Sequence, residues 1–264
     1  MSVFALLLRF LCAIALLCFL CSSPTIILAQ DEDPTVTQWN SWYMFFGNHR
    51  LSERWGLHTE YQWRREGLGA CWQQSLLRIG ADRYLKSGPM LSVGYAWIQS
   101  FPYGEQPVAY DFHEHRIWQQ LILRHRAGVV DFQHRYLSEQ RFLQRKEAAE
   151  HGYEHEEWLL RHRARYRFFM TLPLNDRTIL PGTLFLAAYD EVFLGFGPGI
   201  GPNILDQNRL YLALGMQFTP AVQLQSGYLN HLVFKSDGIR AERNHTLQLA
   251  LTINLDLRRA EEIP

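Results

Sequence analysis

Polar and apolar residues alternate along most of this chain, often over runs of ten residues or more. From Arg161 to Arg167 every second residue is an arginine, and the positions between include Ala164 and Tyr166. Alternate side chains of a β-strand point to opposite faces. On a helix, the same arginines would spread around the whole surface and leave no apolar stripe. The pattern therefore predicts a strand with one charged face and one largely apolar face.

The same alternation recurs towards the end of the chain. Every odd position from 247 to 257 is leucine or isoleucine, and most even positions from 246 to 256 are polar. Segments of about ten residues that alternate in this way are typical of transmembrane β-barrels, whose strands face lipid on one side and a polar lumen on the other. The sequence predicts an all-β fold, an antiparallel up-and-down transmembrane β-barrel.

Eleven runs read as strands, namely 39–46, 53–64, 72–84, 90–99, 113–125, 129–142, 156–170, 183–193, 208–217, 221–230 and 246–257. Bacterial single-chain barrels have even strand numbers, so we expect about twelve, with one more strand within 30–38, or ten if one run does not cross. From residue 85 onward, short links such as 86–88 mostly alternate with long ones such as 101–112 and 143–155. Short periplasmic turns and longer outer loops are typical of such barrels, which would place the C-terminus in the periplasm.

Periodicity alone does not decide which face lies inside, so a soluble periplasmic calyx with an apolar interior remains an alternative. The membrane interpretation is favoured by the length of the strands and by aromatic residues near their ends, such as Trp39, Trp55, Trp63 and Trp97. Aromatic girdles of this kind mark the two interfaces of membrane barrels.

The first 29 residues form a different kind of sequence. Arg9 is their only charged residue, the run 10–20 is entirely apolar, and Ala29 offers a small residue for cleavage. This arrangement predicts a secretory signal peptide over 1–29, since the apolar run is shorter than the roughly 20 residues of a membrane-spanning helix. The remaining chain divides into a short segment 30–38, a barrel over 39–258 and a tail over 259–264. Cys71 is then the one cysteine of the mature chain, which excludes an intramolecular disulfide.

The predicted lumen face carries many charges although the whole chain of 264 residues is neutral, with 26 basic and 26 acidic residues. Such charges can neutralise one another in a structural ion-pair lattice. Alternatively, an excess of arginine over carboxylate can make a pore that prefers anions. The residues predicted to form this network are Arg54, Glu60, Arg78, Glu114, Arg116, Arg135, Glu139, Arg141, Arg161, Arg163, Arg165, Arg167 and Arg209.

Other candidate chemistry is weak. His113 and His115 share a strand face, but that face is the outer one and no third ligand is evident, so we predict no metal and no cofactor. No serine lies in a recognisable nucleophile motif, so no catalytic residue is assigned, although a barrel enzyme acting on lipid or lipopolysaccharide remains an alternative. The glycine-rich segment 195–201 lacks the lysine of a phosphate loop. Balanced charge and export argue against nucleic-acid binding.

Several short motifs resemble those of a bacterial family catalogued as domain of unknown function 2490. They are Glu114–Gln120, His134–Arg141, Arg161–Tyr166, Tyr189-Asp190-Glu191, Gln207-Asn208-Arg209 and Gly227-Tyr228, and the likeness spans roughly 39–257. The resemblance implies an outer-membrane-type barrel with charged inward positions and implies no activity. We therefore expect an integral outer-membrane protein of a Gram-negative bacterium, with the character of a narrow or plugged anion-leaning channel. Its expected partners are outer-membrane lipids and lipopolysaccharide, the barrel-assembly machinery and a small anionic solute.

Overall fold

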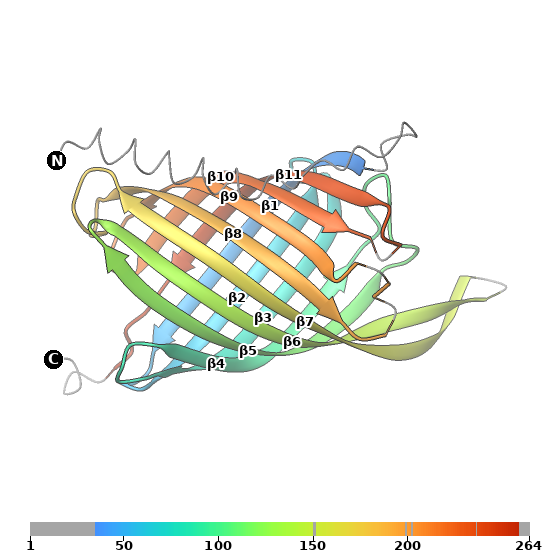
Figure 1. The fold of residues 1–264 in the computed structure, drawn as a ribbon, viewed down its shortest axis with the longest axis horizontal. Helices are drawn as coiled ribbons and strands as arrows, with labels where there is room; N and C mark the ends of the chain where they lie inside the picture. The colour runs from blue at the N-terminus through green and yellow to red at the C-terminus, as the bar shows by residue number, and fades with distance from the viewer. Residues whose placement is uncertain (1–34, 150–151, 199, 202, 236, 259–264) are drawn as a thin grey trace. The chain divides into compact units, whose positions relative to one another are not determined.

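The computed structural model describes residues 35–258 apart from 150, 151, 199, 202 and 236, and this part of the chain closes into one β-barrel (Figure 1). The predicted leader, residues 30–34 and the tail 259–264 lie outside the described residues. No described helix has the length and hydropathy needed to cross a membrane. The strands are β1 (Thr35–Arg50), β2 (Trp55–Glu66), β3 (Cys71–Tyr84), β4 (Met90–Ser100), β5 (Phe112–Ala127), β6 (Val130–Ala149), β7 (Gly152–Pro173), β8 (Leu184–Phe196), β9 (Leu205–Gln217), β10 (Val222–Phe234) and β11 (Ala241–Ile253).

The barrel has eleven strands in the described residues, neither the twelve expected nor the alternative ten. Residues 35–38 extend β1 and do not form a strand of their own. In an up-and-down barrel with an odd number of strands, the first and last strands run in the same direction. Accordingly β1 pairs with β11 in parallel, from Thr35 opposite Ala241 to Phe46 opposite Thr252, whereas all other neighbours are antiparallel. The sheet is therefore mixed.

The connections fall at two ends of the barrel because successive strands reverse direction. The turn end holds the connections 51–54, 85–89, 128–129, 174–183 and 218–221 and the last residue of β11. The loop end holds 67–70, 101–111, 197–204 and 235–240, together with the end of β6 and the start of β7. The parallel closure places the start of β1 at the loop end, opposite to the end of β11.

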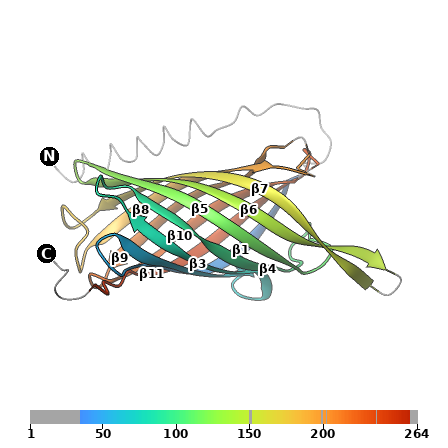
Figure 2. The same ribbon diagram turned by 90° about the horizontal axis from the view of Figure 1, so that it is seen from below.

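The long connection predicted over 143–155 is largely strand. β6 and β7 stay paired from Asp131 opposite Thr171 as far as Ala149 opposite Gly152, with one irregularity after Lys146. This hairpin extends beyond the other strands in both views of the ribbon (Figures 1 and 2). Arg145, Lys146 and Glu147 are three charged residues in a row, so the polar and apolar alternation that marks the other strands is absent from this part of the sequence.

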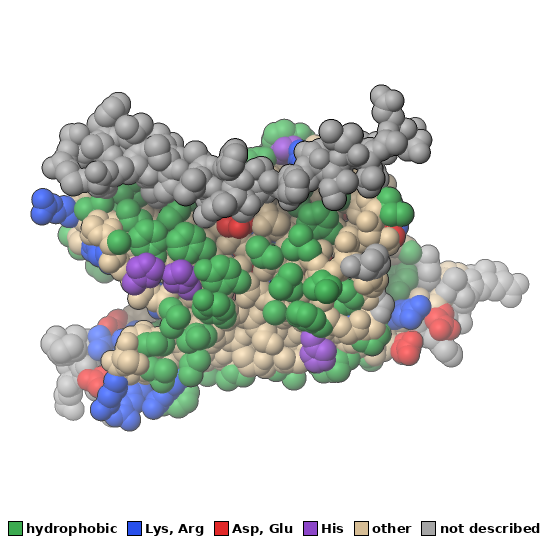
Figure 3. All heavy atoms as spheres, viewed as in Figure 1, with side chains coloured by type: hydrophobic (Ala, Val, Ile, Leu, Met, Phe, Trp, Pro, Cys, Tyr) green, Lys and Arg blue, Asp and Glu red, His purple; other side chains and the backbone are tan. Residues whose placement is uncertain are grey.

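The outer surface of the barrel is rich in apolar side chains, and the inner face carries most of the buried charge. Leu77 and Ile79 on β3 are 52% and 50% exposed, whereas their neighbour Arg78 is 3% exposed. Hydrophobic side chains spread over the strands on the face shown in Figure 3. This distribution is the reverse of a water-soluble barrel, in which the apolar face would point inward.

One inner wall is also apolar. Its side chains come from β1 and from β8 to β11 and are Trp42, Met44, Phe185, Ala187, Tyr189, Tyr211, Ala213, Leu229 and Ala250. Most of the buried charges lie on the other side of the interior, on β2, β3, β5, β6 and β7.

Candidate functional site

Charged residues meet inside the barrel because the strand register places them opposite one another. Glu139 on β6 is the direct partner of Arg163 on β7, and Glu191 on β8 is the direct partner of Arg209 on β9. Side chains of directly opposite residues lie close enough to interact. A band of charge therefore forms around the inner wall from residues that are far apart in the sequence.

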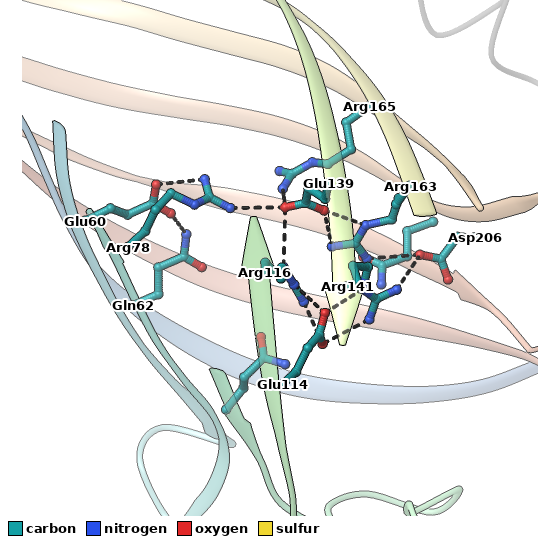
Figure 4. A network of polar contacts seen from close by, with 12 residues as sticks. Glu60, Gln62, Arg78, Glu114, Arg116, Glu139, Arg141, Arg163, Arg165 and Asp206 are labelled. Carbon is teal, nitrogen blue, oxygen red and sulfur yellow. Dashed lines mark hydrogen bonds and ion pairs between the residues drawn. The ribbon is translucent and has the colours of Figure 1, made fainter. Parts of the chain in front are cut away.

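Glu139 is the centre of this band (Figure 4), and its side chain is fully buried. Its carboxylate lies 2.7 Å from Arg163 Nη2, 3.2 Å from Arg78 Nη2, 3.2 Å from Arg165 Nη1 and 3.5 Å from Arg116 Nη1. These arginines come from β3, β5 and β7, so one carboxylate joins four strands across the lumen.

Four more carboxylates extend the band outward from the arginines around Glu139. The pairs are Arg78 with Glu60 at 3.0 Å, Arg165 and Arg135 each with Glu191 at 2.7 Å, Arg116 and Arg141 with Glu114, and Arg163 with Asp206 at 3.0 Å. Buried charges persist when they are paired and hydrogen-bonded, and the planar fork of arginine suits several carboxylates at once. We call these eleven residues the ion-pair band: Glu60, Arg78, Glu114, Arg116, Arg135, Glu139, Arg141, Arg163, Arg165, Glu191 and Asp206.

The structure brings nine of the thirteen residues predicted from the sequence into this band, and two more lie beside it. Arg167 donates to Gln133 at 3.0 Å, and Arg209 donates to Gln207 at 2.9 Å. Arg161 follows the same face of β7 towards the loop end, where its Nε donates to the carbonyl oxygen of Pro198 at 3.0 Å.

The placement of Arg54 in the lumen was wrong. Arg54 lies exposed in the connection 51–54, because β1 ends at Arg50 and β2 begins only at Trp55. In the sequence, Arg54 continues the alternation of polar and aromatic residues of β2, but it lies one residue before the strand begins.

The sequence interpretation missed two members of the band, Glu191 and Asp206. Glu191 shares the inward face of β8 with Phe185, Ala187 and Phe193, all fully buried, so β8 has apolar residues on both faces and no readable register. Asp206 belonged to a predicted link, but β9 begins one residue earlier, at Leu205. The triplet Tyr189-Asp190-Glu191 in the family resemblance was the available signal for Glu191.

Two cavities lie on either side of the band along the barrel axis. The turn-end cavity, about 240 Å³, reaches Asn254, and the loop-end cavity, about 200 Å³, reaches Phe101. Their linings share Gln62, Arg78, Arg165 and Arg209, which therefore stand between them. The described lining of the loop-end cavity has one carboxylate, Glu242, against eight basic residues: Arg64, Arg78, Arg116, Arg141, Arg163, Arg165, Arg209 and Lys235.

The loop 101–111 reaches from β4 and β5 to strands on the other side of the mouth. The Tyr103 hydroxyl donates to Glu242 on β11 at 3.4 Å, and Lys235 Nζ donates to the Gln106 carbonyl oxygen at 3.4 Å. Burial, together with the neighbouring Glu242 carboxylate, raises the pKa of the Tyr103 hydroxyl, so it remains a donor at physiological pH. Since Phe101, Tyr103 and Gln106 line the loop-end cavity, this loop forms part of its wall at the mouth.

His113 and His115 lie on the outer face, where they stack with Trp97 and Tyr95. In the part of the chain that the structure describes, no group of three or more His, Cys, Asp or Glu side chains could hold a metal ion.

The fold and the interior define a closed β-barrel with an apolar outer surface and a lumen crossed by ion pairs. Residues 39–242 match the family described as protein of unknown function (DUF2490), and the chain belongs to that family. Comparison with curated proteins gave no significant match, and neither did comparison with solved structures.

Proposed function

We propose that this protein is an integral barrel of a Gram-negative outer membrane, exported by an N-terminal signal peptide. The outward side chains support this proposal, because Leu77, Ile79, Val93 and Leu214 are each at least half exposed in mid-strand positions. This outward apolar surface, which we call the outer belt, is unfavourable in water and suits acyl chains. Outer-membrane lipids and lipopolysaccharide would then contact the belt, and the barrel-assembly machinery would insert the chain.

We further propose that the lumen is an occluded, anion-leaning conduit. The observation that carries this proposal is the ion-pair band between two cavities whose linings hold more basic than acidic side chains. Rings of arginine attract anions and repel cations in narrow pores, where low-dielectric walls strengthen the field. The band blocks free passage, so permeation requires some of its ion pairs to part.

Two measurements test this function. Carbonate-washed membranes should retain the protein, and release into the soluble fraction would favour the soluble calyx instead. In planar bilayers with a salt gradient, the purified, heat-modifiable protein should give small conductance steps. Their reversal potential should be shifted towards the equilibrium potential of the anion. A silent barrel, or one that prefers cations, would contradict the conduit.

We favour a transport or structural role over catalysis, because the buried carboxylates of the band already form ion pairs with neighbouring arginines. Lipid profiles of a deletion strain compared with its parent check this choice. Altered acyl chains or altered lipopolysaccharide, restored by the wild-type gene, would support the barrel-enzyme alternative.

A further inference from the structure

Two arginines in the wall of the loop-end cavity form no salt bridge among the described residues, although Glu60 attracts one of them and Glu191 the other from a greater distance. Arg64 on β2 and Arg209 on β9 are each 7% exposed and contact neutral groups. Arg64 Nη1 donates to Gln74 at 2.8 Å and its Nε donates to Gln62 at 3.0 Å, and Arg209 donates to Gln207. Amide oxygens satisfy hydrogen bonds but do not neutralise a buried positive charge.

Both guanidinium groups make cation–π contacts with the indole ring of Trp42. Their central carbons lie 3.9 Å (Arg64) and 5.0 Å (Arg209) from its ring centre, and Trp42 is itself fixed by an Nε1 hydrogen bond of 2.7 Å to Gln73. The two arginines repel each other. Cation–π contact with a buried indole orients them but leaves their net charge in place.

Unused hydrogen-bonding atoms mark the same place. The Nε–H of Arg209 is a buried donor without a partner. Nδ1 of His231, a residue that is 3% exposed and also lines the cavity, is unpartnered as well, but it is an acceptor because Nε2 carries the proton towards Gln207 Oε1. The His231 ring packs edge-on against Trp42 at 5.2 Å, while its Nε2 lies 3.0 Å from Gln207. Buried polar atoms normally have partners, so an unused guanidinium donor beside a cavity indicates a place for a bound acceptor.

From this geometry we infer a binding site for a small oxyanion group, carboxylate or phosphate, between Arg64 and Arg209, where a protonated phosphate oxygen could also donate to His231 Nδ1. Such a group accepts hydrogen bonds from guanidinium forks and reduces the repulsion between the two arginines. The cavity volume of about 200 Å³ restricts the ligand to a small molecule. The inference rests on the proposed function in one respect, since it identifies where an anion would pause on the loop-end side of the band.

The test is calorimetric titration of the purified, folded full chain in detergent, with sodium phosphate and with sodium acetate separately, at constant ionic strength set by chloride. The wild type should bind one of the two saturably. Tighter binding of phosphate assigns the site to phosphate groups, and tighter binding of acetate assigns it to carboxylates. Absence of saturable binding by both overturns the inference.

Variants locate the site. Arg64→Gln and Arg209→Gln should each weaken the affinity by about tenfold or more, the effect of losing charge-assisted hydrogen bonds. Arg240→Gln, which removes an exposed arginine paired with Asp237, should leave the affinity unchanged. Equal affinities in all three variants would overturn the placement.

Heat modifiability on a gel checks the folding of each variant. If a glutamine variant does not fold, Arg→Lys at the same position replaces it, and it should weaken binding because lysine lacks the planar fork. Failure of this inference is distinguishable from failure of the proposed function. Anion-selective conductance without saturable binding would refute the binding site and leave the proposed conduit. Saturable binding by a protein that shows no conductance would refute the conduit and leave the binding site.

Discussion

Glu139 and Arg163 face each other directly across β6 and β7, and their side chains form an ion pair with an oxygen–nitrogen distance of 2.7 Å. Arg163 Nε donates a second hydrogen bond of 2.8 Å to the same carboxylate. The contact is local in the sheet, yet Glu139 also binds arginines of β3 and β5. The band therefore ties the two sides of the lumen together through one side chain.

Replacing this carboxylate should destabilise the barrel strongly. Glu139→Gln leaves four arginines facing each other without their shared counter-charge, and breaking a buried ion pair from one side costs about 3–5 kcal/mol. The free energy of unfolding, from urea titration of the detergent-folded protein, measures this loss. Asp131→Asn is the control, because the Asp131–Arg126 pair at the turn end is exposed and should contribute less than about 1 kcal/mol. Similar values for the two variants would show that the interior is as hydrated as the surface.

Arg163→Leu tests the same contact from the other side. The substitution deprives Glu139 and Asp206 of a partner at once, since Arg163 Nη1 lies 3.0 Å from Asp206. We expect a loss of a few kcal/mol in the free energy of unfolding. The double variant Glu139→Gln/Arg163→Leu should lose less than the sum of the single variants, because the residues share one interaction. Strict additivity would mean that the two side chains act independently.

The outer belt gives a prediction of opposite character. Ile79→Arg places a charge on the outward face of β3, next to Arg78 of the ion-pair band and therefore near the middle of the barrel wall. In a bilayer, an arginine at this depth costs about 2–4 kcal/mol. Folding titrations into lipid vesicles measure the cost, and Leu68→Arg in the exposed connection 67–70 should be nearly neutral. An Ile79→Arg variant that folds as well as the wild type would place this face in water.

The sequence was sufficient for those elements in which one face is apolar and the other polar. The leucines of β11 and the arginines of β7 were assigned to the correct faces of their strands. Side chains alternate between the two faces, and in these strands the outward face is apolar and the inward face is polar. Glu191 was missed because the interior near β8 is apolar, so both faces of that strand carry similar residues.

Closure of the barrel was not predictable from the same pattern. Alternation gave eleven runs, and the even numbers usual for bacterial barrels led to the expectation of twelve or ten. Whether Thr35 pairs with Ala241 depends on contact between the two ends of the chain. Alternation describes each strand separately and carries no information about that contact. The two cavities follow from closure too, since the turn-end lining combines β1 with β9, β10 and β11, and the loop-end lining combines β2 and β3 with β9, β10 and β11.

Gly104 should control the position of the loop 101–111. Its φ is +68°, and a Cβ atom there would overlap the side-chain amide of Gln38 on β1. Gly104→Ala therefore combines backbone strain with crowding of the Gln38 side chain and should displace the loop from the mouth. We expect larger or more frequent openings in planar bilayers. Gly88→Ala is the matched control, since Gly88 also has a positive φ of 103° but its Cβ would enter open space at the turn end. Equal conductance in both variants would show that the loop does not limit passage.

The parallel pairing of β1 with β11 places the two ends of the barrel chain at opposite ends of the barrel, and therefore on opposite sides of the membrane if the barrel spans one as proposed. The start of β1 is at the loop end, and the end of β11 is at the turn end. An epitope tag inserted directly before Thr35 and a tag placed after residue 258 should therefore differ in accessibility. With the turn end in the periplasm, intact cells should bind antibody against the first tag, whereas the second should require permeabilisation. Barrels of ten or twelve strands would place both tags on one side, because an even number of crossings returns the chain to where it started. Equal accessibility of the two tags would thus exclude the parallel closure, and a reversed result would keep eleven strands while inverting the orientation.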